Sequence, residues 1–167
     1  MDGLIADQGS AAVFSVLAAG GVGFDDPLSS PTPAGASAMA VADFDGDAHP
    51  DVAVTLWGGQ AVAILLGIGD GRFAPARMYP VGVRPTAMAT ADFNLDGLPD
   101  IAVALEGGVI SVLPGMGGGL FAAATDVQVP GLLRALCAGD WNADGRPDLL
   151  TIDWVGNNLI QVMNVSQ

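Results

Sequence analysis

A nine-residue acidic pattern occurs three times in the chain at a nearly constant interval. The copies are DFDGDAHPD, DFNLDGLPD and DWNADGRPD, which begin at Asp43, Asp92 and Asp140 and are therefore 49 and 48 residues apart. The surrounding sequences AMAVADFDGDAHPDVAV, AMATADFNLDGLPDIAV and ALCAGDWNADGRPDLLT align without gaps. Repeats of this length are structural units that pack side by side into propellers or solenoids. The repeat therefore constrains the fold more than any other feature of the sequence.

Each repeat has the pattern of four short β-strands. An alternating run enters the acidic loop, and three later runs are apolar or rich in β-branched residues. The chain contains 24 glycines and 11 prolines, a composition that disfavours long helices. The predicted strands after each loop are Asp51–Leu56, Ala61–Leu66 and Arg77–Val81, then Asp100–Leu105 and Val109–Leu113, then Asp148–Asp153 and Asn158–Met163. Four strands in about 48 residues form one propeller blade.

The predicted fold class is therefore all-β, a partial β-propeller of about three and a half four-stranded blades. Residues 1–36 are expected to form the outer strands of a degenerate blade, followed by blades at 37–85 and 86–133 and an incomplete blade at 134–167. Residues 25–36 resemble a linker in composition, but their spacing places them as a degenerate outer strand. Closed propellers usually contain four to eight blades, so we expect the remaining blades to come from a longer parent chain or from a second copy.

The acidic loops predict metal binding. Carboxylates in close contact repel each other by about 4 kcal/mol per pair at an effective dielectric constant of about 20. The chain has no lysine, and Arg146 is the only arginine in the three loops. Alternating aspartate and asparagine oxygens are suitable ligands for Ca²⁺, so we expect about three calcium sites. The predicted ligands, with His49, Leu98 and Arg146 contributing their carbonyls, are Asp43, Asp45, Asp47, His49 and Asp51; Asp92, Asn94, Asp96, Leu98 and Asp100; and Asp140, Asn142, Asp144, Arg146 and Asp148.

Two other interpretations of the loops are an EF-hand and an acidic turn without a metal. An EF-hand needs glutamate at the twelfth position, where this chain has Val54, Val103 and Thr151, and it needs a helix to follow. An acidic turn without a metal is common for one cluster, but three copies at a fixed interval favour a metal. The first loop departs from the other two because Ala48 stands where they have glycine, and a positive φ there would cost about 1 kcal/mol or more.

The three loops, followed by LLGIGDGRF, resemble the FG-GAP or VCBS repeats of integrin α-subunit heads and many secreted bacterial proteins. The resemblance covers nearly the whole chain and is strongest from Ser37 to Asn164. It implies a calcium-stiffened β-propeller, usually seven-bladed, that works outside the cell or at its surface in adhesion or ligand binding.

The second turns lie on the face of the sheets opposite the acidic loops. The resemblance implies that this face binds the ligand. Trp57, Glu106 and Trp154 occupy equivalent positions there, and exposed tryptophans could stack on sugars or anchor a protein. The alternative is that they pack against a neighbouring blade.

The pattern places three further aromatic residues and the single cysteine in the interior. Phe44, Phe93 and Trp141 are expected in the core between blades. Cys137 aligns with two alanines and is expected at a small core position.

Charge and composition exclude several other functions. The net charge of −13 disfavours nucleic acid and anionic membrane as partners, and no apolar run is long enough to be inserted into a membrane. No signal peptide is visible, because Asp2 and Asp7 precede the apolar stretch 11–24 where basic residues would be required.

Catalysis finds little support in the sequence. His49 is the only histidine, and GMGGGL lacks the lysine and hydroxyl of a phosphate-binding loop. The predicted function is a non-catalytic calcium-binding module of a secreted or surface protein that binds protein or glycan. The alternative is part of a larger secreted enzyme, of the lyase or lipase type, whose active site lies mostly outside this chain.

Overall fold

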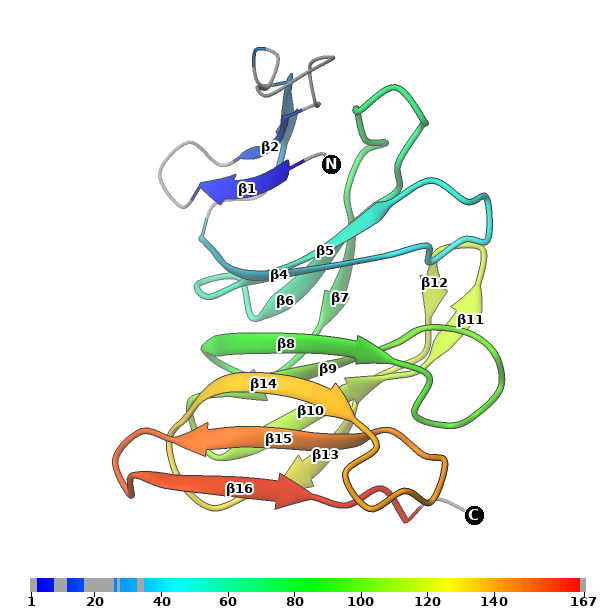
Figure 1. Cartoon of the computed structure of the whole chain (residues 1–167). Helices are drawn as coiled ribbons and strands as arrows, with labels where there is room; N and C mark the ends of the chain where they lie inside the picture. The colour runs from blue at the N-terminus through cyan, green and yellow to red at the C-terminus, as the bar shows by residue number, and fades with distance from the viewer. Residues whose placement is uncertain (1–2, 8–11, 17–25, 27, 33–34, 166–167) are drawn as a thin grey trace.

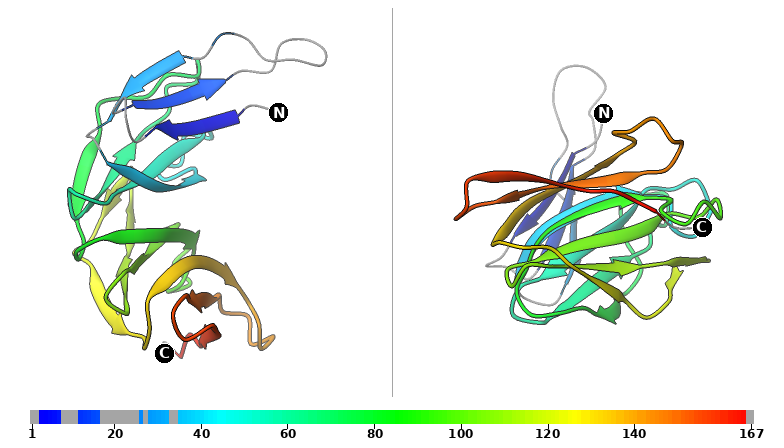
Figure 2. Two further views of the ribbon diagram at one scale, coloured as in Figure 1. Left: turned by 90° about the vertical axis from the view of Figure 1, so that its left-hand side faces the viewer. Right: turned by 90° about the horizontal axis from the view of Figure 1, so that it is seen from below.

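The chain folds into four antiparallel sheets that follow one another along an open arc (Figures 1 and 2). The computed structural model describes residues 3–7, 12–16, 26, 28–32 and 35–165. Fourteen strands of these residues form the sheets, and two short strands form a separate hairpin. The prediction of an all-β partial propeller is confirmed. Within the described segments there is no helix of a length and apolarity that could cross a membrane.

The two middle sheets have four strands each, and the two outer sheets have three in the described residues. The first sheet contains β1 (Gly3–Asp7), β2 (Ala12–Val16) and β3 (Leu28–Pro31). The second contains β4 (Ala36–Ala42), β5 (Asp51–Leu56), β6 (Ala61–Leu65) and β7 (Arg77–Pro80). The third contains β8 (Pro85–Ala91), β9 (Asp100–Leu105), β10 (Val109–Leu113) and β13 (Thr125–Gln128). The fourth contains β14 (Leu133–Gly139), β15 (Asp148–Asp153) and β16 (Asn158–Val162).

The hairpin of β11 (Gly115–Gly117) and β12 (Leu120–Phe121) lies between β10 and β13 in the chain. The equivalent turn of the second sheet has an isolated bridge between Gly67 and Phe73.

The second strands of the middle sheets form the centre of the core. Every residue of β5 and of β9 is buried. Their sequences, DVAVTL and DIAVAL, are apolar at nearly every position because neighbouring sheets cover both faces of these strands.

The first strands of the sheets are rich in alanine and lie side by side, β4 against β8 and β8 against β14. Each has a register irregularity near its start, between Ala36 and Ala38 in β4 and between Pro85 and Ala87 in β8. The residue inside the irregularity binds the next sheet. Ser37 donates from Oγ to the Pro85 carbonyl at 2.9 Å, and Thr86 donates from Oγ1 to the Leu133 carbonyl at 2.8 Å.

The strand bounds agree closely with the sequence pattern. β5, β9, β10 and β15 have the predicted bounds, whereas β6, β7 and β16 end one residue earlier than predicted. Within the segment 25–36, β3 is the last strand of the first sheet, as predicted, although positions 25, 27 and 33–34 lie outside the described residues.

Two of the residues assigned to the interior are exposed. Phe44 is 3% exposed and Phe93 packs partly buried, but Trp141 is 48% exposed. Cys137 is also exposed, so its assignment to the core was wrong. Cys137 lies in β14 and Trp141 lies in the loop that follows it, on the side where, in the earlier sheets, the next sheet packs. No further sheet follows in the described residues, and the positions therefore face solvent.

Candidate metal centre

The three acidic loops connect the first and second strands of the second, third and fourth sheets. We call them the first (43–51), second (92–100) and third (140–148) acidic loop. Two positions of each loop have positive φ. In the first loop these are Gly46 (φ 86°) and Ala48 (φ 68°), whereas the other loops reverse the order, with Leu95 (φ 61°) and Gly97 (φ 86°) in the second. The φ requirement at Ala48 was predicted, but the second left-handed position was not.

The first aspartate of each loop organises the backbone around its carboxylate. Asp43 accepts from the backbone N–H of Gly46 at 2.7 Å and of Ala48 at 2.9 Å. Asp92 and Asp140 accept in the same way from the N–H of Gly97 and Gly145, at 2.8 and 2.9 Å. The loop therefore folds around a negative charge.

The last aspartate of each loop is buried and joins two turns. Asp51 Oδ2 accepts from the Phe44 N–H at 2.7 Å, and its Oδ1 accepts from the Gly67 N–H at 2.7 Å. Asp100 and Asp148 make the equivalent pairs of bonds. Burial raises the pKa of Asp51 and of Asp100, although the backbone N–H donors partly oppose the effect.

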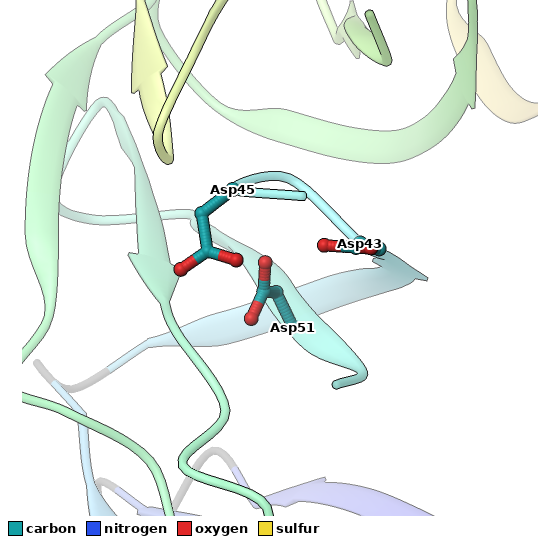
Figure 3. A group of neighbouring side chains, drawn as sticks. All are labelled: Asp43, Asp45 and Asp51. Carbon is teal, nitrogen blue, oxygen red and sulfur yellow. The ribbon is translucent and has the colours of Figure 1, made fainter. Parts of the chain in front are cut away.

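Three carboxylates of the first loop converge. Ligand atoms of Asp43, Asp45 and Asp51 all lie within 4.8 Å of one another, and Figure 3 shows the three side chains around one space. Asp43 and Asp45 lie in the loop, and Asp51 is the first residue of β5. The structure therefore brings together three of the five residues predicted for this site.

The other two predicted residues of the first loop interact with each other. The Asp47 carboxylate accepts from the His49 backbone N–H at 2.8 Å and lies 2.9 Å from His49 Nδ1. The backbone bond, followed by the ring contact, lowers the pKa of Asp47, and the carboxylate raises the pKa of His49. Asp47 would have to turn away from the imidazole to join the other three carboxylates.

In the second and third loops the side chains of the third and fifth loop residues bind each other instead. Asn94 donates from Nδ2 to Asp96 at 2.9 Å, and Asn142 donates to Asp144 at 3.0 Å. The backbone N–H groups of the three residues predicted to give carbonyl ligands, His49, Leu98 and Arg146, donate to the fifth loop residue.

The predicted ligand face is at the opposite ends of the sheets. Glu106 accepts from Arg84 and from Arg134, each at 3.1 Å, and the Arg84 guanidinium lies 5.4 Å from the centre of the Trp57 ring. Trp57 is 47% exposed and, with Arg134, lines a pocket of about 400 Å³. Trp154 is 70% exposed and does not line this pocket.

The two arginines and the glycines at the third turns were missed from the sequence. Arg134 replaces the small hydroxyl residue found at the equivalent positions 37 and 86, and this departure from the repeat was a usable signal. Gly67 and Gly115 recur at one repeat position. A Cβ at either glycine would lie 2.4 or 2.5 Å from a proline carbonyl oxygen, so this close approach requires glycine.

The repeats are similar in sequence to a known protein family. The sequence profile of the FG-GAP-like repeat matches residues 49–103 and 92–151, which together cover more than half of the chain. The chain belongs to the FG-GAP-like repeat family. The resemblance inferred from the acidic loops is thereby confirmed. None of the curated proteins matches the chain.

Solved structures share the fold of this FG-GAP-like repeat protein at low sequence identity. A crystal structure of BBS1N in complex with ARL6DN, soaked with lead, has a TM-score of 0.58 and 14% identity over 99% of this chain. TcdB2-TccC3 without its hypervariable C-terminal region has a TM-score of 0.53 and 17% identity over 96% of this chain. The chain spans 57% of the first of these structures and 8% of the second.

Proposed function

We propose that this FG-GAP-like repeat module binds Ca²⁺ at its acidic loops and serves as a rigid, non-catalytic binding module at the cell surface or outside the cell. The convergence of Asp43, Asp45 and Asp51 is the observation that carries the proposal. Three carboxylates within 4.8 Å supply hard oxygen ligands, which Ca²⁺ prefers and which repel one another without a cation.

The equivalent geometry of the other two loops supports two further sites. In each loop the first aspartate gathers backbone N–H groups, and the last aspartate joins the loop to the third turn. A bound ion would neutralise the aspartates at the junction of two turns and make that end of each sheet more rigid. Binding at the first loop would also require Asp47 to leave His49.

Calcium titration provides the main test. At about 1 mM Ca²⁺ and a dissociation constant of about 10⁻⁴ to 10⁻³ M, each site adds about 0.4 to 1.4 kcal/mol of stability. We therefore expect the thermal midpoint to rise with Ca²⁺ and to fall with EDTA. Equilibrium dialysis should give about three bound ions per chain.

Single-charge variants locate the sites. Asp43→Asn, Asp92→Asn and Asp140→Asn should each weaken one site, whereas Asp26→Asn, an exposed residue outside the loops, should leave binding unchanged. If the chain bound no calcium and EDTA left its melting curve unchanged, the metal assignment would be wrong.

The partner is proposed to be a glycan or protein that contacts Trp57. The support is the exposed indole beside a pocket that Arg134 also lines, which combines a stacking surface with guanidinium hydrogen-bond donors. A glycan array and a surface-protein panel should lose signals with Trp57→Ala but keep them with Trp154→Ala. Identical profiles for wild type and Trp57→Ala would argue against this surface.

A further inference from the structure

Two arginines and one glutamate form a charged group across the third and fourth sheets. Glu106 Oε2 accepts from Arg84 and its Oε1 accepts from Arg134, each at 3.1 Å. The two guanidiniums share a single carboxylate, which leaves one positive charge in excess within the group. Asp153, the last residue of β15, is buried, and its carboxylate accepts from backbone N–H groups instead. A local positive charge in a chain of net charge −13 favours an anionic ligand at this place.

Arg134 is the member of this group that lines the pocket of about 400 Å³ beside Trp57. The equivalent residues of the preceding sheets, Ser37 and Thr86, donate from their hydroxyls to a carbonyl of the next sheet. The Arg134 side chain extends instead to Glu106 in the preceding sheet. This departure from the repeat therefore places a guanidinium on the pocket, where the other sheets have a hydroxyl.

The Arg134 guanidinium has donors for a further anion. A guanidinium has five N–H donors, and within the described part of the chain Arg134 donates to Glu106 alone. Its side chain is 44% exposed. A carboxylate can accept two parallel N–H bonds from the planar fork of a guanidinium. The pocket therefore offers a carboxylate a bidentate contact.

The Trp57 indole gives the same pocket a flat apolar wall. The Trp57 backbone N–H donates to the Gly35 carbonyl at 2.8 Å, which fixes the turn at the edge of the pocket. The C–H face of a sugar ring can pack on an indole. A uronic acid has its carboxylate directly on such a ring, so its apolar face and its anion are adjacent. An aspartate or glutamate side chain has the anion but no ring. An indole and a guanidinium in one pocket therefore fit a uronic acid.

Most of the negative charge of the chain lies at the other end of the sheets. Ten of the 18 acidic residues belong to the acidic loops, four in the first and three in each of the others. A six-residue strand such as β5 separates each loop from the second turn, a length of about 20 Å at about 3.3 Å per residue. Exposed charges are screened over about 8 Å at physiological ionic strength. The loops therefore do not prevent an anion from binding at Arg134.

We propose that the pocket lined by Trp57 and Arg134 binds a uronic acid of a glycan, with the sugar ring on the indole and the carboxylate on the guanidinium. This assignment rests on the proposed ligand surface at Trp57 and names the class of sugar that it binds. A neutral sugar lacks the anion for Arg134, and an acidic peptide lacks the ring for Trp57.

Uronate oligosaccharides and their carboxyl-reduced forms are matched probes, because reduction replaces the carboxylate by a neutral hydroxymethyl group and keeps the ring. Short glucuronate, galacturonate and mannuronate oligosaccharides are screened on an array and then titrated by calorimetry. We expect at least one to bind about tenfold or more tightly than its reduced form, because a hydrogen bond to a charged group contributes at least the 1.4 kcal/mol of a tenfold change. Equal binding of both forms, lost in Trp57→Ala, would overturn the uronate assignment and leave the ligand surface in place. Glycan binding that Trp57→Ala left unchanged would overturn both.

Variants of the chain locate the carboxylate. Arg134→Gln should remove the preference for the uronate over its reduced form. Arg72→Gln changes the net charge equally at the third turn of the second sheet, where Arg72 pairs with Asp70, and should keep the preference. Arg134→Ser restores the residue type of the repeat, so it should fold and also lose the preference; a preference that it retained would overturn the proposal. An acidic peptide or a sulfated oligosaccharide that bound as tightly as the uronate would also overturn it.

Discussion

At the scale of single residues, the acidic loops differ in where they place glycine. The first loop has glycine at the earlier left-handed position and alanine at the later one, and the second loop has the reverse. A left-handed conformation costs a residue with a Cβ about 1 to 2 kcal/mol. Each of these two loops therefore contains one strained residue with a Cβ, Ala48 in the first loop and Leu95 in the second.

Exchanging these residues changes stability in opposite directions. Ala48→Gly should stabilise the chain by about 0.5 to 1 kcal/mol, and Gly97→Ala should destabilise it by about 1 kcal/mol. No atom lies within 4 Å of a Cβ at Gly97, so the backbone alone causes the loss. Urea unfolding in EDTA measures both. Gly107→Ala, equally uncrowded but without positive φ, is the control and should not destabilise.

Asp153 is a second departure from the repeat with a local explanation. It stands where Leu56 and Leu105 are buried in the preceding sheets. Its carboxylate accepts from the Leu132 N–H at 3.0 Å and from the Val155 N–H at 3.2 Å. Backbone N–H donors, Leu132 first and then Gly156, lower the pKa of Asp153. An ionised side chain thus replaces an apolar one because it satisfies backbone donors.

The sign of the pH dependence follows from the lowered pKa. The ionised carboxylate stabilises the fold above the unfolded-state pKa of about 3.9, and this contribution is lost as the pH falls through the folded-state pKa. Asp153→Asn should therefore lower the urea midpoint at neutral pH, and the difference from wild type should shrink in acid. A difference that grew on acidification would contradict this role.

At the scale of elements, the first strands join the sheets through one hydroxyl each. Thr86→Val should destabilise the chain by about 1 to 2 kcal/mol, because it leaves the buried Leu133 carbonyl without this donor. Ser37→Ala should have a similar effect through Pro85. Thr125→Val, on the exposed outer strand β13, is the matched control. If all three variants unfolded at the same urea concentration, the hydroxyl bonds between sheets would contribute nothing to stability.

The strands could be predicted because each repeat confirms the others. The runs DVAVTL and DIAVAL have the same length and the same position in the repeat. A match to a strand pattern that arose by chance in one repeat would not recur in the next. The side-chain geometry of the loops could not be predicted in this way. The contact between Asp47 and His49 depends on a ring that only one loop has, and the Arg84–Glu106–Arg134 group joins residues 22 and 28 positions apart. Burial at Trp141 and Cys137 depends on a neighbouring sheet, which the local pattern cannot show.

At the scale of the whole molecule, the sheets form a series in which each packs mainly against its neighbours, as Figure 2 shows. Stability in such a series depends on the contacts at each junction, so the ends should open before the middle. β5 and β9 are buried throughout, whereas β16 is largely exposed.

Hydrogen exchange followed by NMR or mass spectrometry should reveal this gradient. Amides of β5 and β9 should exchange slowest and those of β16 fastest, with the inner strands β4 and β8 between them. EDTA should speed exchange near the acidic loops of all three later sheets. Uniform exchange across the four sheets would show that the molecule opens as one cooperative unit, and the junctions would then be stronger than their separate contacts indicate.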